Sequence, residues 1–208
     1  MLTKDYLINE FTSPLDSLSL DEISDMKISE NLPLSELIEL NFHKERRISF
    51  RSAWVLEKIA FKDINYLAPV FEDMLNRFNK IHNPSLARHY NKILLQVFYL
   101  RRKNALPEEL KIILEKSNPE IIIEGCFKWI LTPKCPVATI VWSIDILLNY
   151  IDDFPWLKDE LPPIIQRLNV DSTPGLKNYC SKLSKKFKKL LIILFSKEKF
   201  YRFIEQIV

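Results

Sequence analysis

The chain has 208 residues, of which 47% are hydrophobic and 27% charged, a composition that lets it bury one large apolar core. It contains only two glycines, which argues against an all-β fold and a nucleotide-binding α/β fold, because both need glycine at tight turns and phosphate loops. The formal net charge of +3 is unevenly spread: residues 1–40 carry −7 and residues 41–208 carry +10. Because the basic residues are not dense, we interpret them as solvated helix faces rather than as a nucleic-acid-binding surface.

Residues 1–31 are acidic and serine-rich, with apolar residues scattered among them. We expect this segment to be a loosely held, partly ordered arm that contains one short helix opened by Ser19 or Asp21. The regular part of the chain then begins at Pro33, a residue type that favours the first turn of a helix. The sequence therefore predicts an arm over 1–31 and a single helical repeat domain over 32–208.

The helix predicted over 46–61 is apolar around most of its circumference, so it must pack on two neighbouring helices. Its polar residues form one stripe at helical spacing, made of Arg47, Arg51, Lys58 and Lys62. A helix over 65–78 follows, with its apolar residues on one face. The two segments are typical of the inner and outer helices of a solenoid.

Pro84 marks the start of the next inner helix, which we expect over 84–102. The segment 107–131 is interrupted by Asn118-Pro119, so it forms either two short helices or one kinked helix. Further helices are predicted over 136–149, 156–168, 174–195 and 197–208.

Three of these helices, those starting near residues 46, 84 and 174, begin alike, with a small residue or a proline followed by a polar residue at one repeat position, and the helix starting at Pro136 follows the pattern less closely. That position is occupied by Arg51, Arg88, Thr139 and Asn178, at separations of 37, 51 and 39 residues. The first and last separations match common helical-repeat lengths, whereas the middle one is too long for a single pair. The predicted fold class is all-α: an α–α superhelix, or HEAT-like solenoid, of about four helix pairs with inner helices starting near residues 46, 84, 136 and 174.

Four blocks of the sequence resemble the repeats of HEAT and armadillo proteins: Ser35–Leu40, Arg47–Leu56, Pro84–Arg88 and Leu131–Ala138. The chain resembles in particular short bacterial HEAT-like proteins of unassigned function. This resemblance implies the solenoid fold. Because such repeats are degenerate, it implies no particular activity.

The sequence offers no pattern for catalysis or for a metal site. His43, His82 and His89 lie in different segments, without the short, fixed spacing of metal ligands. No glycine-rich phosphate loop exists, so we expect no cofactor and no enzymatic activity. The three cysteines are odd in number and irregularly spaced, which favours free thiols in a reducing compartment. With a polar start and no apolar run of membrane-spanning length, the predicted location is the cytoplasm.

The main alternative to a protein-binding module is a DNA-binding protein. Trp142 and Asp145 lie one turn apart on the helix predicted over 136–149, and Trp54 occupies the matching repeat position. In these residues the chain resembles HEAT-like alkylpurine DNA glycosylases, which use tryptophans, an aspartate and a basic groove to hold a damaged base. Repeat periodicity assigns both tryptophans to the core or the flank, which favours the first interpretation.

We expect a non-catalytic module whose concave face binds an acidic protein segment, since successive basic side chains can track an extended acidic chain. The residues predicted to line this groove are Arg47, Arg51, Arg88, Lys92, Thr139, Ser143, Asn178 and Lys182. The charge asymmetry also suggests the hypothesis that the acidic arm itself occupies the groove.

Overall fold

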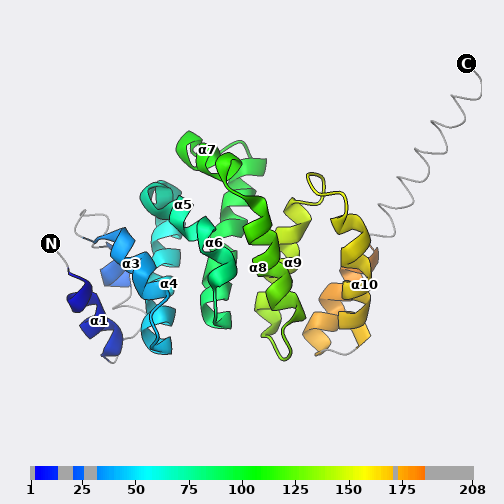
Figure 1. Ribbon diagram of the computed structural model, residues 1–208, viewed down its shortest axis with the longest axis horizontal. Helices are drawn as coiled ribbons and strands as arrows, with labels where there is room; N and C mark the ends of the chain where they lie inside the picture. The colour runs from blue at the N-terminus through cyan, green and yellow to red at the C-terminus, as the bar shows by residue number, and fades with distance from the viewer. Residues whose placement is uncertain (1–2, 14–20, 26–31, 171–172, 186–208) are drawn as a thin grey trace, which may run out of the picture. The chain divides into compact units, whose positions relative to one another are not determined.

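The computed structural model describes residues 3–13, 21–25, 32–170 and 173–185 (Figure 1). Every regular element in these ranges is a helix, which confirms the all-α prediction. The chain divides into two compact units, 1–149 and 150–208, which are treated separately below. The end of the helix predicted over 174–195 and the helix predicted over 197–208 lie outside the described residues.

The first unit contains α-helices and two short 3-10 helices. Their bounds are α1 (Lys4–Thr12), α3 (Leu34–Asn41), α4 (Arg46–Lys62), η1 (Ile64–Leu67), α5 (Ala68–Asn76), η2 (Phe78–Lys80), α6 (Pro84–Arg102), α7 (Glu108–Lys116), α8 (Pro119–Leu131) and α9 (Val137–Asn149). Residues 21–25 are also helical. The inner helices thus begin where the sequence predicts, whereas the outer helix predicted over 65–78 is divided into η1, α5 and η2.

Helix starts follow local chemistry. The side chain of Asn83 accepts a hydrogen bond of 2.7 Å from the backbone N–H of Leu86, and Pro84 occupies the first turn of α6. Asn118 caps α8 in the same way, with a hydrogen bond of 3.0 Å from the N–H of Glu120. The Asn-Pro dipeptide therefore starts a new helix, and 107–131 forms two helices rather than one that is kinked.

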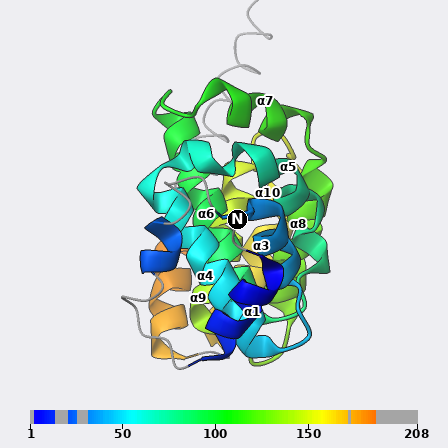
Figure 2. The same ribbon diagram turned by 90° about the vertical axis from the view of Figure 1, so that its left-hand side faces the viewer.

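The helices of the first unit form two layers. Figure 2 shows α4, α6 and α9 on one side and α3, α5 and α8 on the other, and neighbours within each layer are in contact. The pairs α3–α4 and α8–α9 pack across the layers. This arrangement explains the wide apolar arc of α4, which buries Val55, Leu56 and Ile59 against neighbours on several sides.

One added helix accounts for the irregular repeat spacing. Helix α6 begins 38 residues after α4, whereas α9 begins 53 residues after α6. Residues 103–118, between α6 and α8, hold α7 with its two connections and account for this difference, and α7 packs on α5. The two-layer arrangement of helices therefore continues through the first unit, although the sequence spacing between its inner helices is not constant.

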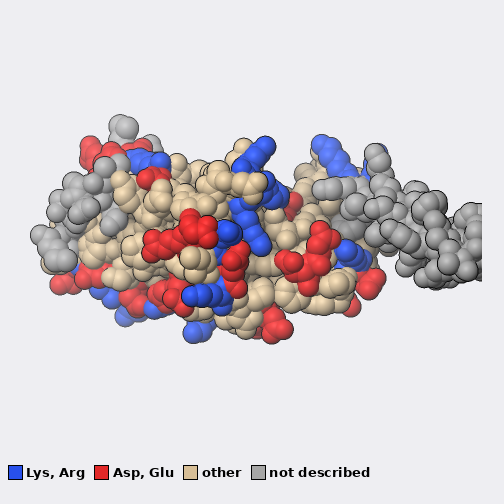
Figure 3. All heavy atoms as spheres, turned by 90° about the horizontal axis from the view of Figure 1, so that it is seen from above, with Lys and Arg blue, Asp and Glu red and all other residues tan. Residues whose placement is uncertain are grey.

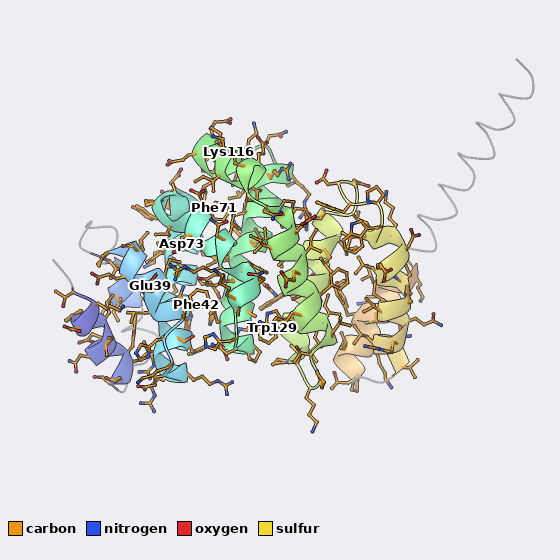
Figure 4. All side chains as sticks on the ribbon, in the orientation of Figure 1. Glu39, Phe42, Phe71, Asp73, Lys116 and Trp129 are labelled. Carbon is orange, nitrogen blue, oxygen red and sulfur yellow. The ribbon has the colours of Figure 1, made fainter. Side chains whose placement is uncertain are left out.

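In the outer layer, Arg77, which directly follows α5, forms ion pairs that connect α3 to α5. Its Nη2 lies 2.6 Å from Oε1 of Glu39, and its Nε lies 2.7 Å from Oδ1 of Asp73. The guanidinium also lies 5.6 Å from the ring centre of Phe42, and Figure 4 shows Glu39, Phe42 and Asp73 close together. The hydrogen bonds to Asp73 and then Glu39 raise the pKa of Arg77.

The arm is more ordered than the sequence indicates. Helix α1 buries Leu7 and Phe11 completely, and Thr3 caps its start by accepting a hydrogen bond of 3.3 Å from the N–H of Tyr6. It packs on α3 and α4 (Figure 2). The apolar pair at i and i+4 therefore fixes this helix to the end of the stack.

The second unit contains α10 (Leu157–Val170) and a helix that includes residues 174–185. Leu161 and Ile165 of α10 are buried, as is Cys180 of the following helix. Ser181 donates a hydrogen bond of 2.9 Å to Oδ1 of Asn169, which joins the two helices near the turn between them.

Candidate interaction surface

All four cations of the predicted α4 stripe contact the acidic arm. Arg47 Nη1 donates a hydrogen bond of 3.1 Å to the carbonyl of Thr12. Arg51 Nη1 donates to the carbonyl of Phe11 at 2.8 Å and to that of Ser13. These carbonyls end α1 and have no partner within the helix, so the two arginines cap its negative end. Burial, and then the charge of Arg47, lower the pKa of Arg51.

The remaining two cations of the stripe pair with residues 21–25. Lys58 Nζ lies 2.6 Å from Oδ1 of Asp21. Lys62 Nζ donates a hydrogen bond of 2.8 Å to Oγ of Ser24 and forms an ion pair with Asp25. The hypothesis that the arm covers part of the basic groove therefore matches these contacts, and the occupied part is the face of α4.

A buried cluster of charges lies between α4 and α6. His89 Nδ1 is 2.5 Å from Oε2 of Glu57, and Lys92 Nζ pairs with the other carboxylate oxygen. His89 is fully buried and its ring lies 5.2 Å from that of Phe50. Burial alone would raise the pKa of Glu57, but the hydrogen bonds from His89 and Lys92 and the charges of these groups lower it further than burial raises it.

Aromatic side chains line the solvent side of the same two helices. The rings of Phe61 on α4 and Tyr99 on α6 are 51% and 48% exposed. Lys92 Nζ lies 5.4 Å from the ring centre of Phe61, and Lys58 Nζ lies 5.7 Å from that of Trp54. We define the α4–α6 surface as Trp54, Lys58, Phe61, Lys62, Arg88, Lys92 and Tyr99. It combines exposed rings with cations, which is the chemistry of contact residues in protein interfaces.

A family model described as a HEAT repeat domain matches residues 7–187. The chain belongs to the HEAT-repeat family. No curated protein and no solved structure matches it. The family assignment confirms the predicted fold, and HEAT repeats generally mediate protein–protein contacts or scaffolding. Among the described helices of this HEAT-repeat protein, none has the length and apolar character to cross a membrane.

Two residues predicted to line the groove lie inside the protein. Asn91 on α6 donates hydrogen bonds to Oγ of Ser143 at 3.0 Å and to the carbonyl of Thr139 at 3.3 Å. Thr139 Oγ1 in turn donates to the carbonyl of Pro84 at 3.2 Å. Thr139 and Ser143 are fully buried, so we remove both from the groove set. Their small side chains allow α6 and α9 to pack closely. The repeat position of a residue in the sequence does not tell whether that residue is buried in such a contact or exposed on the surface.

Burial separates the remaining predicted residues. Arg88 is exposed, and its side chain makes no ion pair with another described residue. Lys92 is about one-third exposed while paired with Glu57. Asn178 and Lys182 are exposed, but they belong to the second unit. The predicted residues that the structure brings together are therefore Arg47 and Arg51 beneath α1, with Arg88 and Lys92 on α6.

The residues of the DNA-binding alternative are distributed over the inner layer. Trp54 lies on α4, and Trp142 and Asp145 lie on α9, with α6 between the two helices. Both tryptophans are half-buried. On the edge that carries α7, Figure 3 shows Lys and Arg side chains mixed with Asp and Glu. This edge therefore lacks the continuous stripe of positive charge that follows a nucleic-acid backbone.

Among the residues that the structure describes, no group of three or more metal-binding side chains occurs. Cys126 is a buried thiol whose pKa is raised by burial, an effect that a hydrogen bond with Ser143 offsets only in part. The Glu57–His89–Lys92 cluster was missed by sequence reasoning because its members come from two helices 32 to 35 residues apart.

Proposed function

We propose that this HEAT-repeat protein is a non-catalytic binding module that docks an acidic protein segment on the α4–α6 surface. The supporting observation is the exposure of Phe61 and Tyr99 next to lysine ammonium groups. Large aromatic rings contribute most of the binding energy in protein interfaces, and nearby cations select acidic partners.

A non-catalytic role is supported by the state of the titratable groups. Glu57 pairs with both His89 and Lys92, and the His89 ring is fully buried, so neither Glu57 nor His89 presents a free group to solvent. A general acid or base needs instead to reach the proton that it transfers. The cluster therefore supports a role in joining α4 to α6.

The surface can be tested by site-specific photo-crosslinking in cells. A photoreactive amino acid at Phe61 or Tyr99 is expected to capture the same partner, and the variant Arg88→Glu should weaken that capture. The matched control is Leu131, which is equally exposed but lies on α8 in the other layer. Equal capture from position 131, or no capture from positions 61 and 99, would contradict the proposal.

Duplex DNA provides the contrasting probe. A mobility-shift assay at about 50 and 200 mM salt would show a steep loss of affinity if the surface contacted several phosphates. Tight, salt-steep DNA binding that is lost on Arg88→Glu would favour the nucleic-acid alternative, whereas the protein-binding proposal predicts weak, sequence-independent shifts only.

A further inference from the structure

The segment 21–25 contacts α4 through two matched pairs of charges. Asp21 and Asp25 are four residues apart, as are Lys58 and Lys62, and each aspartate pairs with one lysine. Residues four apart lie on the same face of a helix, one turn from each other. Two helical segments therefore place their charges face to face at the same spacing. Ile23, between the aspartates, is only 3% exposed.

This segment is attached differently from α1. Helix α1 buries two large side chains completely and has its terminal carbonyls bound by Arg47 and Arg51. The carboxylates of Asp21 and Asp25, by contrast, are 43% and 60% exposed. Exposed ion pairs of this kind each change an equilibrium by only about 1.4- to 5-fold. Residues 21–25 otherwise bury only the smaller side chains of Ile23 and Ser24, which makes them the more easily displaced of the two arm segments.

We infer that Lys58, Phe61 and Lys62 form a docking site for an acidic amphipathic helix of the partner, and that residues 21–25 are the intramolecular occupant that this helix displaces. The inference rests on the proposed function and names the partner's chemistry. The matching ligand carries two carboxylates one turn apart with an apolar residue between them. Phe61 lies about one turn from Lys58 on α4 and is 51% exposed, so a longer helix can gain an apolar contact there.

A nucleic acid fits this site less well. Arg47 and Arg51, the other cations of α4, are engaged by backbone carbonyls of α1, so the free positive track is short. Nucleic-acid binders rely on many successive phosphate contacts. The paired spacing of carboxylates and ammonium groups instead specifies a helical protein ligand.

The test uses the full chain and a fluorescein-labelled synthetic peptide with the sequence of residues 18–26, followed by fluorescence anisotropy. The attached segment competes with the peptide at high effective concentration, so the wild type should bind it weakly. The double variant Asp21→Asn and Asp25→Asn should bind about 2- to 30-fold tighter, from the combined strength of two exposed ion pairs. Glu22→Gln is the matched control, because Glu22 is exposed in the same segment and pairs with neither lysine.

A second arm of the experiment alters the charges on each side of the contact, first in the peptide and then on α4. A peptide in which both aspartates are replaced by asparagine should bind the double variant at least several-fold more weakly than the parent peptide. A higher salt concentration should weaken binding of the parent peptide to the same variant. Changing Lys58 and Lys62 to Gln in the double variant should also reduce binding, with helical content checked by circular dichroism.

Three results would overturn the inference. One is equal affinity of the wild type, the double variant and Glu22→Gln for the peptide; another is undiminished binding of the asparagine peptide. The third is a gain in affinity of the double variant for duplex DNA without a gain in its affinity for the peptide. Failure of the proposed function is a separate result: crosslinking from Tyr99 can succeed when the peptide fails, and the peptide can bind when no partner crosslinks.

Discussion

Replacing Glu57 by Gln tests whether the buried cluster holds α4 and α6 together through charge. The wild-type carboxylate accepts from His89 at 2.5 Å and from Lys92 with its other oxygen. A glutamine has the same size, but hydrogen bonds to a neutral oxygen are about half as strong. Lys92 is about one-third exposed and can turn to water, whereas His89 cannot. We therefore expect a loss of about 1–3 kcal/mol in the free energy of unfolding, below the roughly 3–5 kcal/mol of a fully buried broken pair.

The sign of the pH dependence follows from the lowered pKa of Glu57. A carboxyl whose pKa is lower in the folded state than its ordinary value of 4.5 stabilises the fold at pH values above that ordinary value. This stabilisation is lost as pH falls through the folded-state pKa, where the wild-type carboxyl also becomes neutral. The difference between the wild type and Glu57→Gln should therefore be full near neutral pH and shrink in acid.

Urea unfolding followed by circular dichroism measures this difference, at neutral pH and at about pH 3. The control is Glu108→Gln, which removes a carboxylate that is 73% exposed and 3.5 Å from Lys111. That control should change stability by less than about 0.5 kcal/mol at either pH. A stability difference for Glu57→Gln that is equal at both pH values would refute the electrostatic reasoning, because the cluster would then act only through packing.

Three further substitutions test the packing of the stack. Gly125→Ala adds a Cβ 2.7 Å from Cδ1 and 3.1 Å from the carbonyl oxygen of Phe78, so we expect the free energy of unfolding to fall by about 1–2 kcal/mol despite the better helix propensity of alanine. The control is Gly175→Ala, whose added Cβ meets nothing within 4 Å. Equal effects of the two substitutions in thermal unfolding would contradict this prediction. Phe11→Ala should cost about 3–5 kcal/mol because the side chain is fully buried, and a cost near zero in urea unfolding would mean that α1 does not contribute to the core. Asn91→Ala should cost about 1–3 kcal/mol, since it leaves Ser143 and the Thr139 carbonyl without their donor; unchanged hydrogen exchange in α9 would count against this link.

Helix positions were predictable because local signals and the layered fold agree. Pro84 and the Asn83 cap define the start of α6, and the wide apolar arc of α4 reflects neighbours on several sides. The order of α1 was missed because the acidic composition of 1–31 outweighed a usable local signal. That signal is Thr3 as a cap, followed by Leu7 and Phe11 at i and i+4.

The candidate surface was only partly accessible from the sequence. The stripe of cations on α4 follows from helical spacing, but its partners on the arm depend on tertiary placement. Burial of Thr139 and Ser143 depends on which face of α9 meets α6, and the irregular sequence spacing of the repeats does not define that face. The alignment of Thr139 with Arg88 assumes a constant sequence spacing between successive inner helices, and the presence of α7 breaks that spacing.

The position of each polar residue along its helix decides how far the positive surface of the first unit extends. Arg88 and Lys92 are the fifth and ninth residues of α6, and the corresponding positions of α9 are Val141 and Asp145. Thr139 is instead the third residue of α9, about 200° around the helix from the fifth. The positive surface therefore ends at α6, and on α4 two of its four cations are taken by α1. The proposed acidic partner would therefore reach from Arg88 and Lys92 on α6 to Lys58 and Lys62 on α4, where it would compete with residues 21–25.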